Sequence, residues 1–335
     1  MPNPPEIQQQ YRAAMTAGGV YARADRGLIE VRGKDRATWL NNLVTNVVKT
    51  LQPGEGNYAF ATSVKGRAVF DMNILILDDR LWLDVDRRQI ETATKHLERY
   101  VITEDVQLAD VSSTVERHAV MGPRAGDAGG RLGLGNFSPM SQLQHVAGRI
   151  GASEARFVRH DFAGVPAFEI IVCGEDRAAA RAALDALAGE LHLATLSAAT
   201  VQILRMEAGI PASVDDIDEE VVPPETGQVE RGISYHKGCY LGQEVIERMR
   251  SHGILARKLA GLRVSGEAII ERGAEILSNS TVVGRVTSSC FSEAMGAVLC
   301  LGYVKSALAK VGTPVRVVVS GDEFSGEVVP LPVNA

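Results

Sequence analysis

The sequence predicts an α+β protein with two similar α+β units followed by a small all-β unit. A strand–hairpin–strand–helix pattern occurs twice in the first two thirds of the chain. Residues 256–335 instead contain short strands separated by glycines. The length of 335 residues exceeds one ordinary core and suggests two or three domains.

The first unit is predicted from the spacing of its apolar residues. Asp86 is a plausible N-cap for the helix that follows the second strand of the hairpin. The expected elements are helices over 7–15, 36–48 and 88–100, and strands over 26–31, 73–77 and 81–85.

The second unit repeats this order without clear sequence identity. We expect strands over 156–158 and 168–172 around a turn at Gly164, and then a helix over 175–190. The glycine-rich stretch 126–135 is predicted to be a surface loop.

The C-terminal unit is predicted to be a barrel or a sandwich, with helical residues only over 305–309. We place the boundary near Gly253, which gives domains 1–253 and 254–335. The expected strands cover 259–264, 282–287, 297–303, 314–319 and 326–329.

Composition excludes several functional classes. A net charge of −6 and a pI near 5.7 argue against a general nucleic-acid binder. The N-terminus lacks the apolar region of a secretory signal, and no apolar run approaches the roughly 20 residues of a membrane span. We therefore expect a cytoplasmic monomer that binds neither nucleic acid nor membranes.

The four cysteines are Cys173, Cys239, Cys290 and Cys300, and none forms a Cys-x-x-Cys pair. Their scatter fits a reducing compartment. It does not supply the cysteine spacing of a [4Fe–4S] site, so we expect no stably bound metal in this chain alone.

The stretch Lys237-Gly238-Cys239-Tyr240-Leu241-Gly242-Gln243-Glu244 is the most distinctive motif. Helical spacing begins after Gly242, which places the thiol just before a helix N-terminus and near the charge of Lys237. Such surroundings favour a thiolate. The alternative is a buried, inert cysteine in a tight turn.

This motif resembles the signature of the YgfZ/Iba-type folate-binding proteins of iron–sulfur cluster maturation, which are relatives of the glycine cleavage T protein. Other parts of the chain are similar to this family in the same order. They are 26–35 with Trp39-Leu40, Arg205-x-Glu207-x-Gly209, Leu301-Gly302-Tyr303-Val304, Gly312-Thr313 and Leu331-Pro332. The resemblance implies a clover-like arrangement of three modules, the last a β-barrel, around a central folate pocket.

The resemblance also implies roles for single residues. Glu207 matches the glutamate that binds the pteridine ring, and Asp71 matches one aspartate of the T-protein pair whose other position holds Phe70. A carboxylate suits the paired N–H groups of an aminopyrimidinone edge. Tyr58 is a candidate for stacking on the ring, and Arg257 or Lys258 for meeting the glutamate tail.

The resemblance leads to the hypothesis of a tetrahydrofolate-binding factor that supports iron–sulfur cluster assembly or repair through Cys239. Its partners would be client enzymes, including tRNA-modifying radical enzymes, or assembly proteins. Two alternatives remain, a tetrahydrofolate-dependent aminomethyltransferase of the glycine cleavage type and a folate-binding module without cysteine chemistry. Cys239, where the T protein generally has aspartate, and Phe70 argue against the first alternative.

Overall fold

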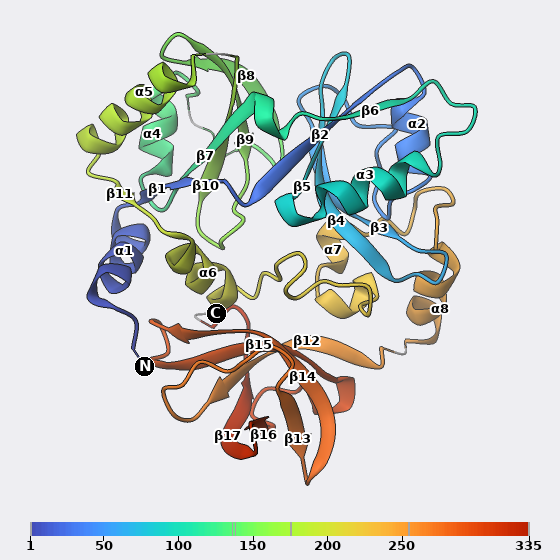
Figure 1. The fold of residues 1–335 in the computed structure, drawn as a ribbon, viewed down its shortest axis with the longest axis vertical. Coiled ribbons are helices and arrows are strands. Elements are labelled where there is room, and N and C mark those ends of the chain that lie inside the picture. Colours follow the sequence, from blue (N-terminus) through green and yellow to red (C-terminus); the bar gives the residue numbers. More distant parts are fainter. Residues whose placement is uncertain (1, 136, 138, 175, 254, 334–335) are drawn as a thin grey trace.

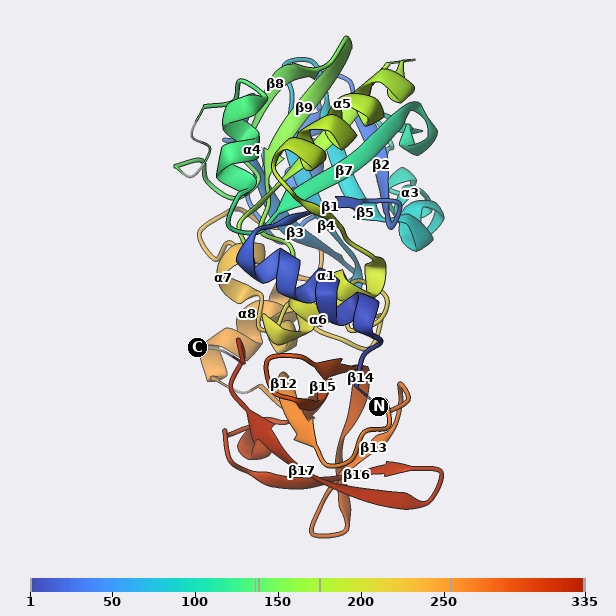
Figure 2. The ribbon, with the colours of Figure 1, turned by 90° about the vertical axis from the view of Figure 1, so that its left-hand side faces the viewer.

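The computed structural model describes residues 2–135, 137, 139–174, 176–253 and 255–333. Two α+β modules lie side by side, and a β-barrel lies beneath them (Figure 1). Helices α1 (Pro5–Thr16) and α6 (Ala198–Glu207) lie between the modules and the barrel (Figure 2). This arrangement confirms the predicted fold class of two α+β units and a C-terminal barrel.

The first module is an antiparallel sheet with strand order β3-β4-β5-β2-β6. Its elements are β2 (Arg26–Arg32), α2 (Arg36–Asn41), β3 (Gly56–Thr62), β4 (Ala68–Ile76), β5 (Leu81–Asp86), η1 (Arg87–Gln89), α3 (Ile90–Glu98), β6 (Gln107–Asp110) and η2 (Ser112–Thr114). The predicted cap at Asp86 is present, since its side chain accepts a hydrogen bond from the backbone N–H of Arg88.

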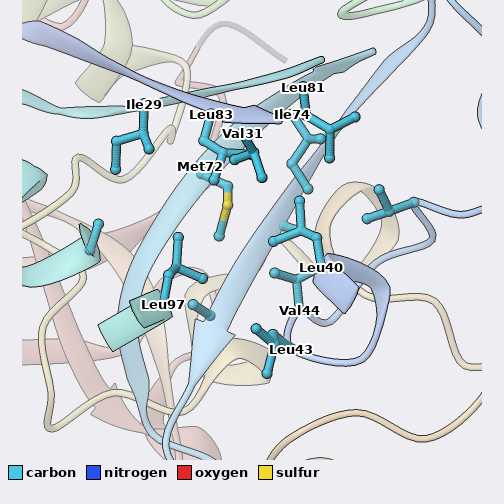
Figure 3. Close-up of a cluster of buried hydrophobic side chains, with 14 of the residues drawn as sticks. Ile29, Val31, Leu40, Leu43, Val44, Met72, Ile74, Leu81, Leu83 and Leu97 are labelled. Atoms are coloured by element: carbon cyan, nitrogen blue, oxygen red, sulfur yellow. The ribbon is translucent and has the colours of Figure 1, made fainter. Parts of the chain in front are cut away.

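Strand β4 sends alternate side chains to opposite faces of this sheet. Phe70, Met72 and Ile74 lie in the core that α2 and α3 cover, and Figure 3 shows Met72 and Ile74 in that core. Asp71 and Asn73 therefore lie on the other face, which is also buried. Burial on both faces explains why the strand is a nearly continuous apolar run.

The second module is a six-stranded sheet with order β11-β1-β7-β10-β9-β8. Its first strand comes from the start of the chain and pairs antiparallel with β7 and parallel with β11. The elements are β1 (Gly19–Ala22), β7 (Val115–Met121), α4 (Ala125–Arg131), β8 (His145–Ile150), β9 (Ser153–Arg159), β10 (Ala167–Cys173), α5 (Arg177–Glu190) and β11 (Ala194–Thr195). Residue 175, where the last helix was predicted to begin, lies outside the described residues.

One loop prediction and the extent of one predicted helix were wrong. The glycine-rich stretch forms α4 over Ala125–Arg131, and Gly129 lies so close to Phe137 that a Cβ would approach its Cδ1 to 2.7 Å. The small residues thus permit close packing of a helix rather than forming a loop. The helix predicted over 36–48 ends at Asn41, whose side chain accepts a hydrogen bond from the N–H of Val48 and so stabilises the irregular segment that follows.

The remaining elements of the upper part connect the modules to the barrel. They are α1 (Pro5–Thr16), α6 (Ala198–Glu207), η3 (Pro223–Thr226), α7 (Val229–Gly232) and α8 (Gln243–His252). Ser197 caps α6 through the N–H of Thr200. Among the described residues, no helix is both long enough and apolar enough to cross a membrane.

The C-terminal unit is a closed barrel with order β12-β15-β14-β13-β16-β17, so the barrel alternative is confirmed over the sandwich. Its elements are β12 (Arg257–Val264), β13 (Glu275–Ser278), β14 (Thr281–Ser292), β15 (Ala297–Lys305), η4 (Ser306–Leu308), β16 (Pro314–Val319) and β17 (Asp322–Val329). The domain boundary between 253 and 254 stays a prediction, and residue 254 lies outside the described residues.

Candidate functional site

A cavity of about 240 Å³ lies where both sheets face α6 and the loop that follows it. Five arginines, four aspartates, one histidine and three aromatic residues are among its lining residues. These charged and aromatic residues are Tyr21, Arg23, Asp25, Arg26, Tyr58, Asp71, Asp86, Arg88, His160, Phe162, Arg205, Asp215 and Arg231. The cavity therefore offers flat apolar walls and charges of both signs.

Asp71 lines this cavity from β4 and is only 6% exposed. One carboxylate oxygen accepts a hydrogen bond from the Ser213 hydroxyl, and the other accepts one from the Tyr58 hydroxyl at 2.9 Å. A carboxylate has about four lone-pair sites, so these two bonds leave acceptor capacity for a ligand. The structure thus brings together two predicted site residues, Asp71 and Tyr58.

Tyr58 lies on β3, and its ring contacts the side chains of Phe60 and Arg231. Its ring packs edge-on against Phe60 at 5.1 Å, and the Arg231 guanidinium lies 4.0 Å from its centroid. Burial, together with the charge of Asp71, raises the pKa of Tyr58 well above its ordinary value. The phenol therefore stays protonated and donates to Asp71 at neutral pH. The predicted stacking on a flat ligand stays a prediction.

Behind the cavity, a network of buried charges joins the two modules. Arg117 on β7 donates to Asp84 on β5 at 2.6 Å and to Glu169 on β10 at 2.7 Å. Arg26 also donates to Asp84, and Arg23 also donates to Glu169. Each carboxylate in this network thus has two arginine partners.

The arginines determine the charge state of the two carboxylates. Burial alone would raise the pKa of Glu169, but the charges of Arg23 and Arg117 outweigh it and hold the pKa well below the usual range. The same balance, with Arg117 and Arg26, lowers the pKa of Asp84. Sequence reasoning missed this network, although Glu169 inside the apolar run 168–172 is a recognisable signal of a paired buried charge.

Glu207 is buried but does not line the cavity. Its carboxylate accepts hydrogen bonds from the Tyr11 hydroxyl at 2.7 Å, the Ser292 hydroxyl at 2.6 Å and the backbone N–H of Ala294 at 3.0 Å. It therefore joins α1, α6 and the β14–β15 turn. The structure does not bring Glu207 together with Asp71, contrary to the arrangement that the resemblance implied.

Cys239 is exposed and is not among the residues that line the cavity. The predicted accessible loop before α8 is present, with Gly242 at φ 78° immediately before the helix. A Cβ at Gly242 would approach the Ser63 carbonyl oxygen to 2.5 Å, so the loop packs tightly on the β3–β4 turn. The structure thus separates the thiol from the cavity that holds Asp71.

Lys237 is directed to the backbone rather than to the thiol. Its ammonium donates to the carbonyl oxygens of Asn41, Val44 and Asn46 at 2.6–2.7 Å. Burial and the charge of Lys49 lower the pKa of Lys237 to about 7. The lysine therefore anchors the motif to the segment after α2.

The other motif residues make local contacts with their neighbours or, in the case of Gly238, border open space. Burial raises the pKa of Tyr240, and Gln243 accepts a hydrogen bond from the Tyr240 N–H through its side chain. Glu244 is exposed and pairs with Arg248 at 3.0 Å. A Cβ at Gly238 would contact nothing within 4 Å, so no described residue requires glycine there for close approach.

Arg257 lies at a second cavity of about 1140 Å³ between the barrel and residues 218–225. It donates to Glu225 at 3.1 Å and lies 5.1 Å from the Tyr303 ring centroid. Arg257 is therefore not beside Asp71. Within the described part of the chain, no group of three or more His, Cys, Asp or Glu side chains could hold a metal ion.

Comparison with known proteins identifies two family regions. Residues 3–234 match the GCVT N-terminal domain, and residues 257–333 match the glycine cleavage T-protein C-terminal barrel domain. The second match coincides with the barrel strands, and the first covers both α+β modules.

Similar curated proteins are named aminomethyltransferase. The protein of Nostoc sp. is 26% identical over 97% of this chain and 87% of its own length. The mitochondrial aminomethyltransferase of Flaveria trinervia is 29% identical over 96% of this chain and 83% of its own length. The crystal structure of the glycine cleavage system aminomethyltransferase T from Bartonella henselae has a TM-score of 0.81, with 20% identity, over 98% of this chain and 89% of that one.

These relatives correct the interpretation of the motif. The hypothesis of a YgfZ-type factor for iron–sulfur cluster assembly, with client enzymes as partners, is wrong, because the relatives favour the aminomethyltransferase alternative. The motif drew attention to a cysteine that lies away from the cavity. Because the first match covers more than half of the chain, this protein belongs to the GCVT N-terminal domain family, and its barrel is similar to the glycine cleavage T-protein C-terminal barrel domain.

Proposed function

We propose that this protein is a tetrahydrofolate-dependent aminomethyltransferase of the glycine cleavage type, with its folate site in the cavity that Asp71 lines. The observation that carries the proposal is the Asp71 carboxylate, which is buried and held by two hydroxyl donors. Its remaining lone pairs can accept the N–H groups of a reduced pterin ring. The names of the relatives supply the reaction class.

The residues present fit a folate ring. Tyr21, Tyr58 and Phe162 give the cavity aromatic walls, which suit a flat heterocycle. A volume of about 240 Å³ is smaller than the roughly 300–1,000 Å³ of pockets that enclose whole drug-sized ligands. We therefore expect the cavity to enclose the ring and to leave the glutamate tail outside.

Tetrahydrofolate supplies the nitrogen that takes up the one-carbon unit. Asp71 accepts a hydrogen bond or a proton at a carboxylate oxygen, while Tyr58 and Ser213 hold that group in one orientation. Arg26, which also lines the cavity and pairs with Asp84, lies near enough to Asp71 for the two charges to attract each other. Water is restricted because Asp71 and Tyr58 are only 6% and 5% exposed.

The two sequence departures do not remove groups from this site. Phe70 lies in the apolar core on the other face of β4, packed edge-on against His96 at 5.8 Å. An aspartate at position 70 would therefore face the core and not the cavity. Cys239 is outside the cavity as well, so its replacement of an aspartate leaves the Asp71 contacts unchanged.

The test is transfer from an aminomethyl-loaded lipoyl carrier protein to tetrahydrofolate. We expect the wild type to form methylenetetrahydrofolate, with the amino nitrogen leaving as ammonia and the carrier sulfur as a free thiol. Asp71→Asn should be about 100-fold slower, the lower range for loss of a positioned acid–base group. Asp322→Asn, at an exposed position on the barrel, is the matched control and should retain the full rate. The proposal fails if the wild type transfers no one-carbon unit, or if Asp71→Asn is as fast as the control.

A further inference from the structure

The turn at residues 212–217 contacts the cavity, the first module and the barrel at once. Ser213 donates to Asp71 on β4, and its carbonyl oxygen accepts from Arg88 at 3.0 Å. Asp215 pairs with the same arginine at 2.9 Å.

The backbone of this turn has an unusual conformation that hydrogen bonds hold in place. Val214 has φ 69°, a left-handed conformation that a β-branched residue rarely adopts. Hydrogen bonds close the turn on both sides, from the Val214 N–H to the Ile217 carbonyl at 2.9 Å and from the Asp216 N–H to the Ala212 carbonyl at 2.8 Å. Unfavourable backbone conformations persist only where surrounding contacts determine them, and they concentrate at functional sites.

Asp216 supplies those surrounding contacts from the opposite side. Its carboxylate, which is fully buried, accepts hydrogen bonds from Arg205 on α6 and from Ser288 on β14, the latter at 2.7 Å. Its carbonyl oxygen accepts from the Tyr303 hydroxyl on β15 at 2.9 Å. The barrel and α6 therefore hold the turn from below, while Ser213 reaches the cavity.

We propose that Ser213 is a positioning residue for the Asp71 carboxylate, and that the barrel holds it in place through Asp216. This inference rests on the proposed function of the cavity. Tyr58 fixes one carboxylate oxygen and Ser213 fixes the other, so the pair prevents rotation of the group about its Cβ–Cγ bond. Without the serine hydroxyl, the carboxylate retains one donor and samples more orientations.

The first test is independent of activity. Crystal structures of the wild type, Ser213→Ala and Ser213→Thr should show the Asp71 carboxylate in one orientation in the wild type and the threonine variant. In Ser213→Ala we expect a rotated or disordered carboxylate. An unchanged, ordered carboxylate in Ser213→Ala would overturn the inference whether or not the protein transfers aminomethyl groups.

The second test uses the transfer assay. We expect Ser213→Ala to lower kcat about tenfold with little change in KM for tetrahydrofolate, because binding contacts remain and orientation is lost. Ser213→Thr should restore most of the rate, and the exposed Ser251→Ala is the matched control. Ser288→Ala should act in the same direction with a smaller loss.

The outcomes separate the two proposals. Absent transfer in the wild type defeats the proposed function, and the crystal structures then decide the role of Ser213 alone. Normal transfer by Ser213→Ala, or a defect that appears only in KM, contradicts positioning. A defect that Ser213→Thr fails to rescue also contradicts it, since the hydroxyl is then not the required group.

Discussion

Replacing Arg117 with methionine should measure how strongly the two α+β modules depend on their buried charge network. Arg117 is 7% exposed and donates to Asp84 in one module and to Glu169 in the other. Arg117→Met keeps much of the side-chain volume but removes both charge-assisted hydrogen bonds. It leaves two buried carboxylates with fewer partners.

The magnitude follows from those contacts. Hydrogen bonds to charged groups contribute about 1.5–3 kcal/mol each, so two would give about 3–6 kcal/mol. Asp84 keeps Arg26, and Glu169 keeps Arg23, so neither charge is left without a counter-charge. We therefore expect the lower end, a loss of about 3 kcal/mol in the free energy of unfolding.

Urea unfolding followed by tryptophan fluorescence is the appropriate assay. Both tryptophans of the chain, Trp39 and Trp82, lie in the first module and are buried there, so the signal reports the part that Arg117 touches. Arg316→Met is the matched control, because Arg316 forms an exposed pair with Glu323 on the barrel. Exposed pairs contribute about 0–1 kcal/mol. A loss below about 1 kcal/mol for Arg117→Met would mean that the buried network stabilises the two modules no more than an exposed ion pair does.

Three further predictions concern a histidine, a lysine and the cysteines. Burial and the charge of Arg156 lower the pKa of His145 to about 4, so the unfolded chain binds the proton first, and stability falls between pH 6.5 and 4. In urea unfolding across that window, the free energy of unfolding should fall less with decreasing pH for His145→Gln than for the wild type. An equal fall in both proteins would contradict the lowered pKa of His145. Lys237→Met should lower Tm by several degrees because three carbonyls lose their donor, while the exposed Lys310→Met should not, and equal Tm values would refute the anchoring role. In limited alkylation read by mass spectrometry, the exposed Cys239 should react first, since burial raises the pKa of Cys290 to about 12 and also raises that of Cys300; earlier labelling of either would contradict this order.

Much of the fold could be predicted because the deciding signals are local. Periodicity located the two units and the barrel strands, and Asp86 identified a helix start. The helix at Ala125–Arg131 could not be predicted in this way, since glycine usually indicates a loop and only contact with Phe137 explains it. Here tertiary packing overrides local preference.

The site was predicted only in part. Tyr58 pairs with Asn73 across β3 and β4, so Asp71, two residues from Asn73, is its diagonal neighbour on the same face of the sheet. Ser213, Arg23 and Arg26 reach the same cavity from distant segments, which no local pattern reveals. The conspicuous motif around Cys239 misled the functional interpretation because residue type alone does not show whether a side chain faces the cavity or solvent.

Calorimetric titration with tetrahydrofolate is the decisive measurement of whether folate binds at Asp71. The wild type, Asp71→Asn, Glu207→Gln and Cys239→Ser should be compared under one set of conditions. We expect about tenfold weaker binding of tetrahydrofolate for Asp71→Asn, the equivalent of one charged hydrogen bond, and less than twofold change for Cys239→Ser and Glu207→Gln. Unchanged affinity in Asp71→Asn, with weaker binding in Glu207→Gln or Cys239→Ser, would contradict a folate site at Asp71.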